Sequence, residues 1–224
     1  GRSQETRELL DRLTYHRFVA VIGSSGCGKS SLVRASLVPA LRAGYNSTTP
    51  DAWRIATLRP GNDPISSLAG ALKEVLYPAK ARSVGRKEQI MKELLAGSLG
   101  IVRVLREAGL PEGGKLLILV DQFEELFTIA EKNRDLSQGE IRDFVQLLID
   151  AAWNREYPIH ILITMRSENI GLCSRFGDLA RVINDGLFLV PRLPSSRLRE
   201  VIEYSVEQKI DPALVTRLIN DLSG

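Results

Sequence analysis

The stretch "VAVIGSSGCGKSSLVRASLVPALRAG" (residues 19–44) places three glycines and a lysine between a short apolar run and a run of helical periodicity. Residues 23–30 satisfy the pattern G-x-x-x-x-G-K-[ST], in which a strand turns through a phosphate-binding loop into a helix. Backbone N–H groups can face inward at Gly26 and Gly28 because no Cβ obstructs them, and the helix dipole attracts phosphate. The stretch therefore predicts a strand, a phosphate-binding loop and a helix in succession.

The side chains of this loop have separate expected roles. Lys29 should reach the β- and γ-phosphates of a nucleotide, and the hydroxyl of Ser30 should ligate Mg²⁺. Cys27 is interpreted as a small packing residue rather than a nucleophile, and Pro39 should kink the following helix. We expect the phosphates to be bound by the whole loop, which consists of Gly23, Ser24, Ser25, Gly26, Cys27, Gly28, Lys29, Ser30 and Ser31.

Five short apolar runs are typical of β-strands and alternate with segments of helical periodicity. Two of them, at 116–120 and 159–165, are almost continuously apolar, as strands covered on both faces require. The alternation predicts a doubly wound α/β fold around a parallel five-stranded sheet. The predicted strands are residues 18–22, 53–58, 116–120, 159–165 and 187–190.

Capping signals mark the helices between these strands. Asp63 and Pro64 supply an N-cap and a first-turn proline, and Ser137 with Glu140 forms a capping box. The predicted helices are residues 65–76, a pair within 86–109 that ends at Gly109, and 141–153.

After Pro194 the periodicity is helical only. We therefore expect a P-loop nucleotide-binding domain over residues 1–193 and the beginning of a helical lid domain over 194–224. The chain has no initiator Met and stops in mid-helical pattern, so we expect it to be a fragment of a longer protein.

Acidic residues follow the third apolar run, in "LLILVDQFEELF". Asp121 ends the run, where a phosphate-loop enzyme holds Mg²⁺ or its water shell. Many enzymes of this class place Glu directly after that Asp, but here the position is Gln122. Glu124 and Glu125 are therefore the candidates for the base that polarises the attacking water, and Glu124 is preferred because Glu125 could cap the next helix. Both could instead be helix N-terminal charges favoured by the dipole.

The fourth apolar run ends in "ILITMR". An arginine emerging from a buried strand at the carboxyl edge of a sheet can touch a γ-phosphate, so Arg166 is the sensor candidate, with Thr164 as a polar neighbour. A plain surface arginine is the alternative.

Composition excludes several other classes of function. The net charge of +3 comes from 30 basic and 27 acidic residues without a run of five like charges, so no nucleic-acid partner is expected. Two cysteines are too few for a disulfide framework, and no apolar run approaches a membrane span, so we expect a cytoplasmic protein without direct membrane contact. The chain has no N-K-x-D motif, which favours ATP and ADP over guanine nucleotides.

Together, "VIGSSGCGKSSLVRASLVPALRAG", "WRIATLRPGNDPISSLAGAL", "ILVDQFEELFT" and "ILITMRSENI" resemble the novel STAND NTPase 1 family, within the signal-transduction ATPases with numerous domains. The resemblance implies that Gly1 and Arg2 end an "F-x-G-R" motif near the adenine, that Asp121 is the Mg²⁺-associated Walker B residue and that Arg166 ends the sensor strand. "TMRSEN" departs from the commoner "R-A-D-F" ending.

Family members are similar to switches: ADP holds a closed monomer, whereas ATP with a trigger favours an open form that oligomerises. Effector and sensor domains are joined to the same chain, and some members act in antiphage defence. We therefore expect an ATP-binding and slowly hydrolysing regulatory module that controls oligomerisation and effector activation in a larger signalling or defence protein. The alternatives are a non-catalytic nucleotide-binding scaffold and a P-loop kinase or motor.

Overall fold

Five parallel strands form the centre of the molecule, in the order β2-β3-β4-β1-β5. The structure, a computed structural model, describes residues 2–45, 52–78, 85–128 and 137–192. Each predicted strand is present with its ends within one residue of the prediction, which confirms the doubly wound parallel sheet. The strands are β1 (Phe18–Gly23), β2 (Trp53–Leu58), β3 (Lys115–Val120), β4 (Ile159–Arg166) and β5 (Leu187–Leu189).

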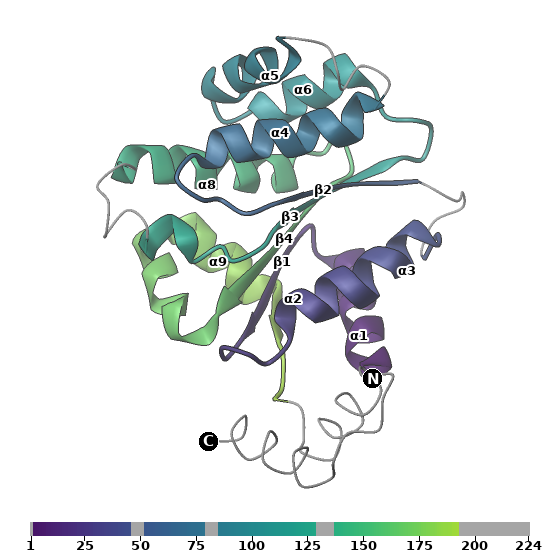
Figure 1. Cartoon of the computed structure of the whole chain (residues 1–224), viewed down its shortest axis with the longest axis vertical. Coiled ribbons are helices and arrows are strands. Elements are labelled where there is room, and N and C mark those ends of the chain that lie inside the picture. The colour runs from purple at the N-terminus through teal and green to yellow at the C-terminus, as the bar shows by residue number, and fades with distance from the viewer. Residues whose placement is uncertain (1, 46–51, 79–84, 129–136, 193–224) are drawn as a thin grey trace, which may run out of the picture.

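Helices cover both faces of this sheet (Figure 1). Because side chains alternate along a strand, Val19 and Val21 of β1 face one apolar cluster and Ala20 and Ile22 face the other. The first cluster is closed by α1 (Ser3–Tyr15) and by the helix that follows β1. The second is closed by α4 (Pro64–Leu76), α5 (Arg86–Leu95), α6 (Gly100–Ala108), α8 (Gln138–Trp153) and α9 (Gly177–Asp185).

The helix starts follow the capping signals. The Asp63 side chain accepts from the Ser66 N–H at the start of α4, and Ser137 with Glu140 forms a complete capping box at α8. The predicted helical pair is present as α5 and α6, which pack closely because a Cβ at Gly100 would lie 2.6 Å from the Glu93 carbonyl oxygen. These predicted helices are therefore confirmed.

The helix after β1 changes its winding along its length. It begins as α2 (Lys29–Ser31), continues in π-helical winding as η1 (Leu32–Leu37) and ends as α3 (Val38–Arg42). Pro39 lacks the N–H that a regular helix would use, which accounts for the altered winding before it, and the kink expected at Pro39 stays a prediction. This winding also determines the direction in which η1 presents its side chains.

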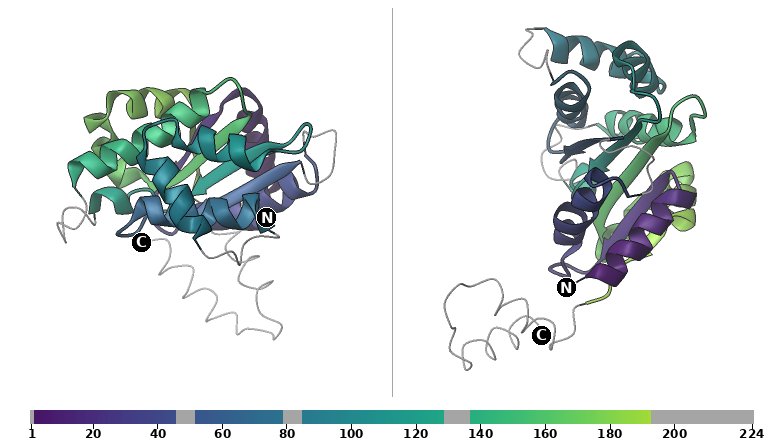
Figure 2. Two further views of the ribbon diagram at one scale, coloured as in Figure 1. Left: turned by 90° about the horizontal axis from the view of Figure 1, so that it is seen from above. Right: turned by 90° about the vertical axis from the view of Figure 1, so that its right-hand side faces the viewer.

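The two ends of the described chain meet beside the phosphate-binding loop. Arg2, which precedes α1, donates to the Pro191 carbonyl oxygen at 3.3 Å, and Figure 2 (right) shows the purple start of α1 beside the yellow-green end of the chain. The predicted lid at 194–224 lies outside the described residues. In the described part of the chain, no helix is long and apolar enough to cross a membrane.

Candidate nucleotide-binding site

The loop between β1 and α2 has the backbone that its glycines predict. Gly26 and Gly28 have φ angles of +72° and +87°, a region that side chains with a Cβ rarely adopt. Gly23 is needed for a different reason, since a Cβ there would lie 2.7 Å from Cys27 Sγ and 3.0 Å from the Val190 carbonyl oxygen. Cys27 is buried against this turn, so its position agrees with a packing role.

Lys29 is held by the loop itself. Its ammonium donates to the carbonyl oxygens of Gly23 and Ser24, each at 2.8 Å, with Cys27 Sγ at 3.9 Å. All of these partners belong to the loop, so the ammonium group is held at the position where the sequence predicts contact with a phosphate.

A cavity of about 290 Å³ opens above the loop and joins it to the carboxyl ends of β3 and β4. A larger cavity of about 510 Å³ lies between α4, α5 and α8 and contains none of the loop residues. The smaller cavity is lined by Ser25, Gly26, Gly28, Lys29, Ser30, Ser31, Gln122, Glu124, Thr164 and Arg166. It therefore unites three segments that are remote in the sequence, and it leaves Glu125 outside.

The register of the sheet brings these segments together. Gly23 at the end of β1 is paired with Arg166 at the end of β4, and Val120 of β3 is paired with Ile163. Asp121 and Thr164, each one residue further along these strands, lie side by side, and the Thr164 hydroxyl donates to Asp121 Oδ1 at 2.6 Å. The Ser30 hydroxyl donates to the same oxygen at 2.8 Å.

Gln122 turns the chain sharply after Asp121. Its φ angle of 58° is the only positive value at a non-glycine position among the described residues. Its N–H donates to Thr164 Oγ1 at 3.0 Å, and the next N–H, of Phe123, donates to the Thr164 carbonyl oxygen at 2.9 Å. A positive φ angle costs conformational free energy at a residue other than glycine, and residues strained in this way are concentrated at functional sites. The turn determines which carboxylate faces the loop.

The two candidate bases point in different directions after this turn. Glu124 is 8% exposed and lines the cavity, whereas Glu125 Oε2 accepts from the Gly61 N–H at 3.3 Å, in the segment after β2. Burial raises the pKa of Glu124, and the nearby Arg166 and Lys29 lower it by less. Burial thus favours the neutral form of the Glu124 carboxyl group.

Arg166 pairs with the preferred base. Its Nε atom lies 3.3 Å from Glu124 Oε1, and about half of its side chain is exposed. None of the described residues donates a hydrogen bond to Glu124 Oε2, although that atom is buried. A water molecule between the two groups would donate to Glu124 Oε2 and accept from Arg166, and would so satisfy both.

Arg2 lies behind the loop and does not line the cavity. Its guanidinium donates to the Cys27 carbonyl oxygen, and a Cβ at Gly28 would lie 3.7 Å from Arg2 Nη2. Ser24 also faces this side, where its hydroxyl accepts from Arg192 at 3.3 Å. Both residues are therefore placed to hold the loop, and their expected contact with nucleotide remains a prediction. Gly1 lies outside the described residues.

The donor set at Asp121 fits Mg²⁺. This ion keeps several of its waters and is held in proteins by one or two carboxylates together with substrate phosphates. The Ser30 hydroxyl oxygen lies beside Asp121, and the buried Asp121 Oδ2 makes no regular hydrogen bond that would occupy its lone pairs. Within the described ranges, no three His, Cys, Asp or Glu side chains gather into a metal site of their own.

The sequence motifs did not predict three charged residues near the cavity. Arg34 of η1 and Arg59 after β2 form ion pairs with Asp121, at 2.9 Å and 3.9 Å. The pKa of Glu168 is lowered, chiefly by its own backbone N–H and to a smaller extent by Lys29 and the N–H of Ser25. Arg34 lies four residues after Ser30, so the two side chains are expected on one face of the helix. This spacing is the one feature of the sequence that could have indicated that Arg34 lies near the predicted metal site.

This combination of a glycine-rich loop after β1, a lysine and serine opening the next helix, and an aspartate after β3 defines a P-loop NTPase domain. The family model described as Novel STAND NTPase 1 matches residues 1–224, and the chain belongs to that family. No curated protein matches the chain.

Solved structures share the fold at low sequence identity. The Walker-type ATPase paby2304 of Pyrococcus abyssi is 15% identical, with a TM-score of 0.59 over 98% of this chain and 62% of its own. The ORC1 protein of Aeropyrum pernix, solved in complex with DNA, is 16% identical, with a TM-score of 0.62 over 99% of this chain and 55% of its own. The ORC2 protein of the same organism, in its ADP form, is 13% identical, with a TM-score of 0.51 over 93% and 52%. The chain thus spans between half and two thirds of the length of these proteins.

Proposed function

We propose that this domain binds ATP with Mg²⁺, hydrolyses it slowly, and serves as a nucleotide-controlled switch for oligomerisation and effector activation in a larger signalling or defence protein. The observation that carries the proposal is the position of Glu124 and Arg166, which line one cavity with Lys29. Groups from the loop, from the turn after β3 and from the end of β4 can therefore all act on one terminal phosphate.

Hydrolysis follows from the roles available to these side chains. The loop N–H groups and Lys29 bind the β- and γ-phosphates, and Ser30 with Asp121 holds the metal ion. Bound Mg²⁺ supplies positive charge that neutralises the phosphate oxygens. Glu124 accepts the proton of a water whose oxygen attacks the γ-phosphorus, while the bond from that phosphorus to the β–γ bridging oxygen breaks. Arg166 stabilises the charge that develops on the γ-phosphate oxygens.

A switch requires a ligand that interacts differently with two states. Arg166 can contact a γ-phosphate and loses that partner when only ADP is bound. The loop is also tied to the chain that leads to residue 193, because Arg192 donates to Ser24 and Arg2 bridges the carbonyls of Cys27 and Pro191. These contacts support a route from phosphate occupancy to the backbone at Pro191 and Arg192.

Nucleotide-dependent assembly of the full-length protein tests the proposal. Mass photometry with ADP, with ATP and with a non-hydrolysable ATP analogue should give a larger species with the triphosphates, in the presence of whatever trigger the protein requires. An Arg166→Gln variant should bind both nucleotides and lose the difference between them. Identical assembly with ATP and ADP in the unmodified protein would contradict a nucleotide switch.

Gln122 favours a second candidate function, a scaffold that holds nucleotide without hydrolysing it. It occupies the position where many enzymes of this class have the catalytic Glu, and its side chain lines the cavity without a charge. Single-turnover measurements of phosphate release separate the two functions. The scaffold predicts tight ATP binding without release, whereas the switch predicts slow release that depends on Glu124.

A further inference from the structure

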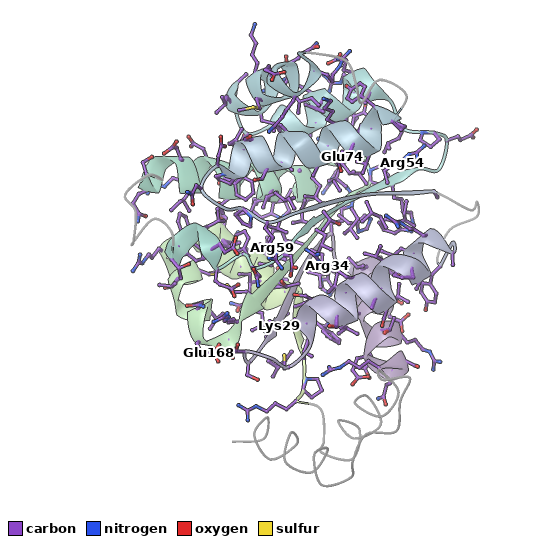
Figure 3. All side chains as sticks on the ribbon, in the orientation of Figure 1. Lys29, Arg34, Arg54, Arg59, Glu74 and Glu168 are labelled. Carbon is purple, nitrogen blue, oxygen red and sulfur yellow. The ribbon has the colours of Figure 1, made fainter. Side chains whose placement is uncertain are left out.

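Arg34 makes the shortest charged contact to Asp121. It lies in η1, and its Nη2 atom is 2.9 Å from Asp121 Oδ2. Arg59 follows β2 and brings its Nε atom to 3.9 Å from the same oxygen. Figure 3 shows the two arginines near each other, Arg34 from the helix that follows β1 and Arg59 from the end of β2. Two guanidinium groups from separate segments therefore face one buried carboxylate.

The two oxygens of Asp121 have different surroundings. Oδ1 accepts hydrogen bonds from the hydroxyls of Ser30 and Thr164. Oδ2 faces Arg34 at ion-pair distance but makes no regular hydrogen bond, so it is the oxygen left to accept from a metal-bound water. Arg34 thus lies where a divalent cation must approach.

The partners of this ion pair differ in their contact with water. The side chain of Asp121 is 1% exposed and that of Arg34 is 48% exposed. A buried carboxylate needs a positive partner, because an unpaired charge in the interior is costly. A half-exposed guanidinium on a flexible stem can move into water at low cost. The carboxylate is therefore fixed, and its counter-ion can be exchanged.

We propose that Arg34 is an exchangeable counter-ion of Asp121, which neutralises the carboxylate in place of Mg²⁺ and gives it up when Mg²⁺ binds with nucleotide. The inference rests on the proposed binding of nucleotide at this loop. Two consequences follow for the binding equilibria. Nucleotide still binds without Mg²⁺, because Arg34 cancels the repulsion between Asp121 and the phosphates, and Mg²⁺ binds less tightly than it would to an unpaired carboxylate.

The test uses the full chain and compares an Arg34→Gln variant with the unmodified protein. Binding of a fluorescent ADP is measured with EDTA and with saturating Mg²⁺, and the affinity of Mn²⁺ for the ADP complex is measured by electron paramagnetic resonance. In Arg34→Gln, we expect the dissociation constant of ADP in EDTA to rise about tenfold, because Asp121 then repels the phosphates. We expect the dissociation constant of Mn²⁺ from the ADP complex to fall by roughly three- to tenfold, because Arg34 no longer competes for Asp121. Binding of ADP with saturating Mg²⁺ should stay close to that of the unmodified protein.

Two further variants complete the test. Arg34→Lys keeps a positive charge and should retain most of the ADP binding in EDTA. Arg42→Gln removes a charge from α3, on the same helical stretch, and should leave both equilibria unchanged. The inference is overturned if Arg34→Gln binds ADP and Mn²⁺ like the unmodified protein, or if Arg42→Gln has the same effect. Failure of the unmodified protein to bind nucleotide under either condition would instead overturn the proposed function, and with it the inference.

Discussion

Replacement of Glu124 by Gln removes one negative charge from the cavity and keeps the size and shape of the side chain. Without a carboxylate to take the proton of the attacking water, we expect the rate of ATP hydrolysis to fall by about 10²- to 10⁴-fold. This loss corresponds to roughly 3–5 kcal/mol of activation free energy, at about 1.4 kcal/mol for each factor of ten. ATP affinity should be retained, because the loop and Lys29 carry the phosphate contacts.

The same substitution should not weaken the fold. Burial is the main cause of the raised pKa of Glu124, so the folded state favours its protonated form. Any stability contributed by this shift is present at low pH and is lost as the pH rises through the folded-state pKa. Gln stays neutral throughout, and the exposed Arg166 contributes less than about 1 kcal/mol to the lost ion pair. At pH 8 the variant should therefore unfold at the same temperature as the unmodified protein or higher.

The assay combines single-turnover release of labelled phosphate with equilibrium binding of ATP, on the full chain. Glu125→Gln is the matched control, because its carboxylate contacts Gly61 outside the cavity and its loss should leave hydrolysis within about threefold of the original rate. A Glu124→Gln variant that hydrolyses ATP normally, or a Glu125→Gln variant that alone loses activity, would refute the assignment of the base.

Three further outcomes are expected. Lys29→Ala should bind ATP at least about 100-fold more weakly in a fluorescence titration, because the loop loses its cation toward the phosphates. Gly23→Ala should lower the melting temperature measured by calorimetry, since its Cβ would lie 2.7 Å from Cys27 Sγ and 3.0 Å from the Val190 carbonyl; a strain of about 1–3 kcal/mol is typical of such overpacking. Burial lowers the pKa of His160 from 6.5 to about 4, so unfolding titrations should show stability falling by about 3 kcal/mol as the pH drops from 6.5 to 4. His160→Gln should flatten that dependence, and an unchanged slope would contradict the shift.

The amino-acid sequence predicts the elements of this fold because their signals are local. The run at 53–58 is present as β2 (Trp53–Leu58), and the capping box of Ser137 and Glu140 starts α8 where expected. An apolar run, an N-cap or a turn glycine shapes only the backbone within a few residues of its own position. A short stretch of sequence is therefore enough to predict the strand, helix start or turn that it forms. The phosphate-binding loop belongs to this class, since the conformations at Gly26 and Gly28 depend on residues inside the motif.

The sequence favoured Glu124 over Glu125 only because Glu125 could cap the next helix, and it did not indicate which of the two side chains faces the phosphate-binding loop. The two residues are adjacent, and the turn at Gln122, whose N–H donates to Thr164 on the neighbouring strand, decides which of them lines the cavity. A backbone rotation at one residue redirects every side chain after it, and the partner that stabilises this rotation is 42 residues away. Pattern analysis has no access to such a contact.

By itself, the sequence of this protein determined a parallel α/β domain with a phosphate-binding loop, an acidic residue after the third strand and an arginine after the fourth. Only the tertiary structure decided what surrounds Asp121. Arg34 and Arg59 reach it from separate segments, over 87 and 62 residues of sequence. The position of Arg34 one helical turn after Ser30 hints at one of these contacts, and the residues around Arg59 give no sign of the other. The physical reason is that helices and strands form through local interactions, whereas the partners of a buried charge are brought together by the crossovers of the sheet.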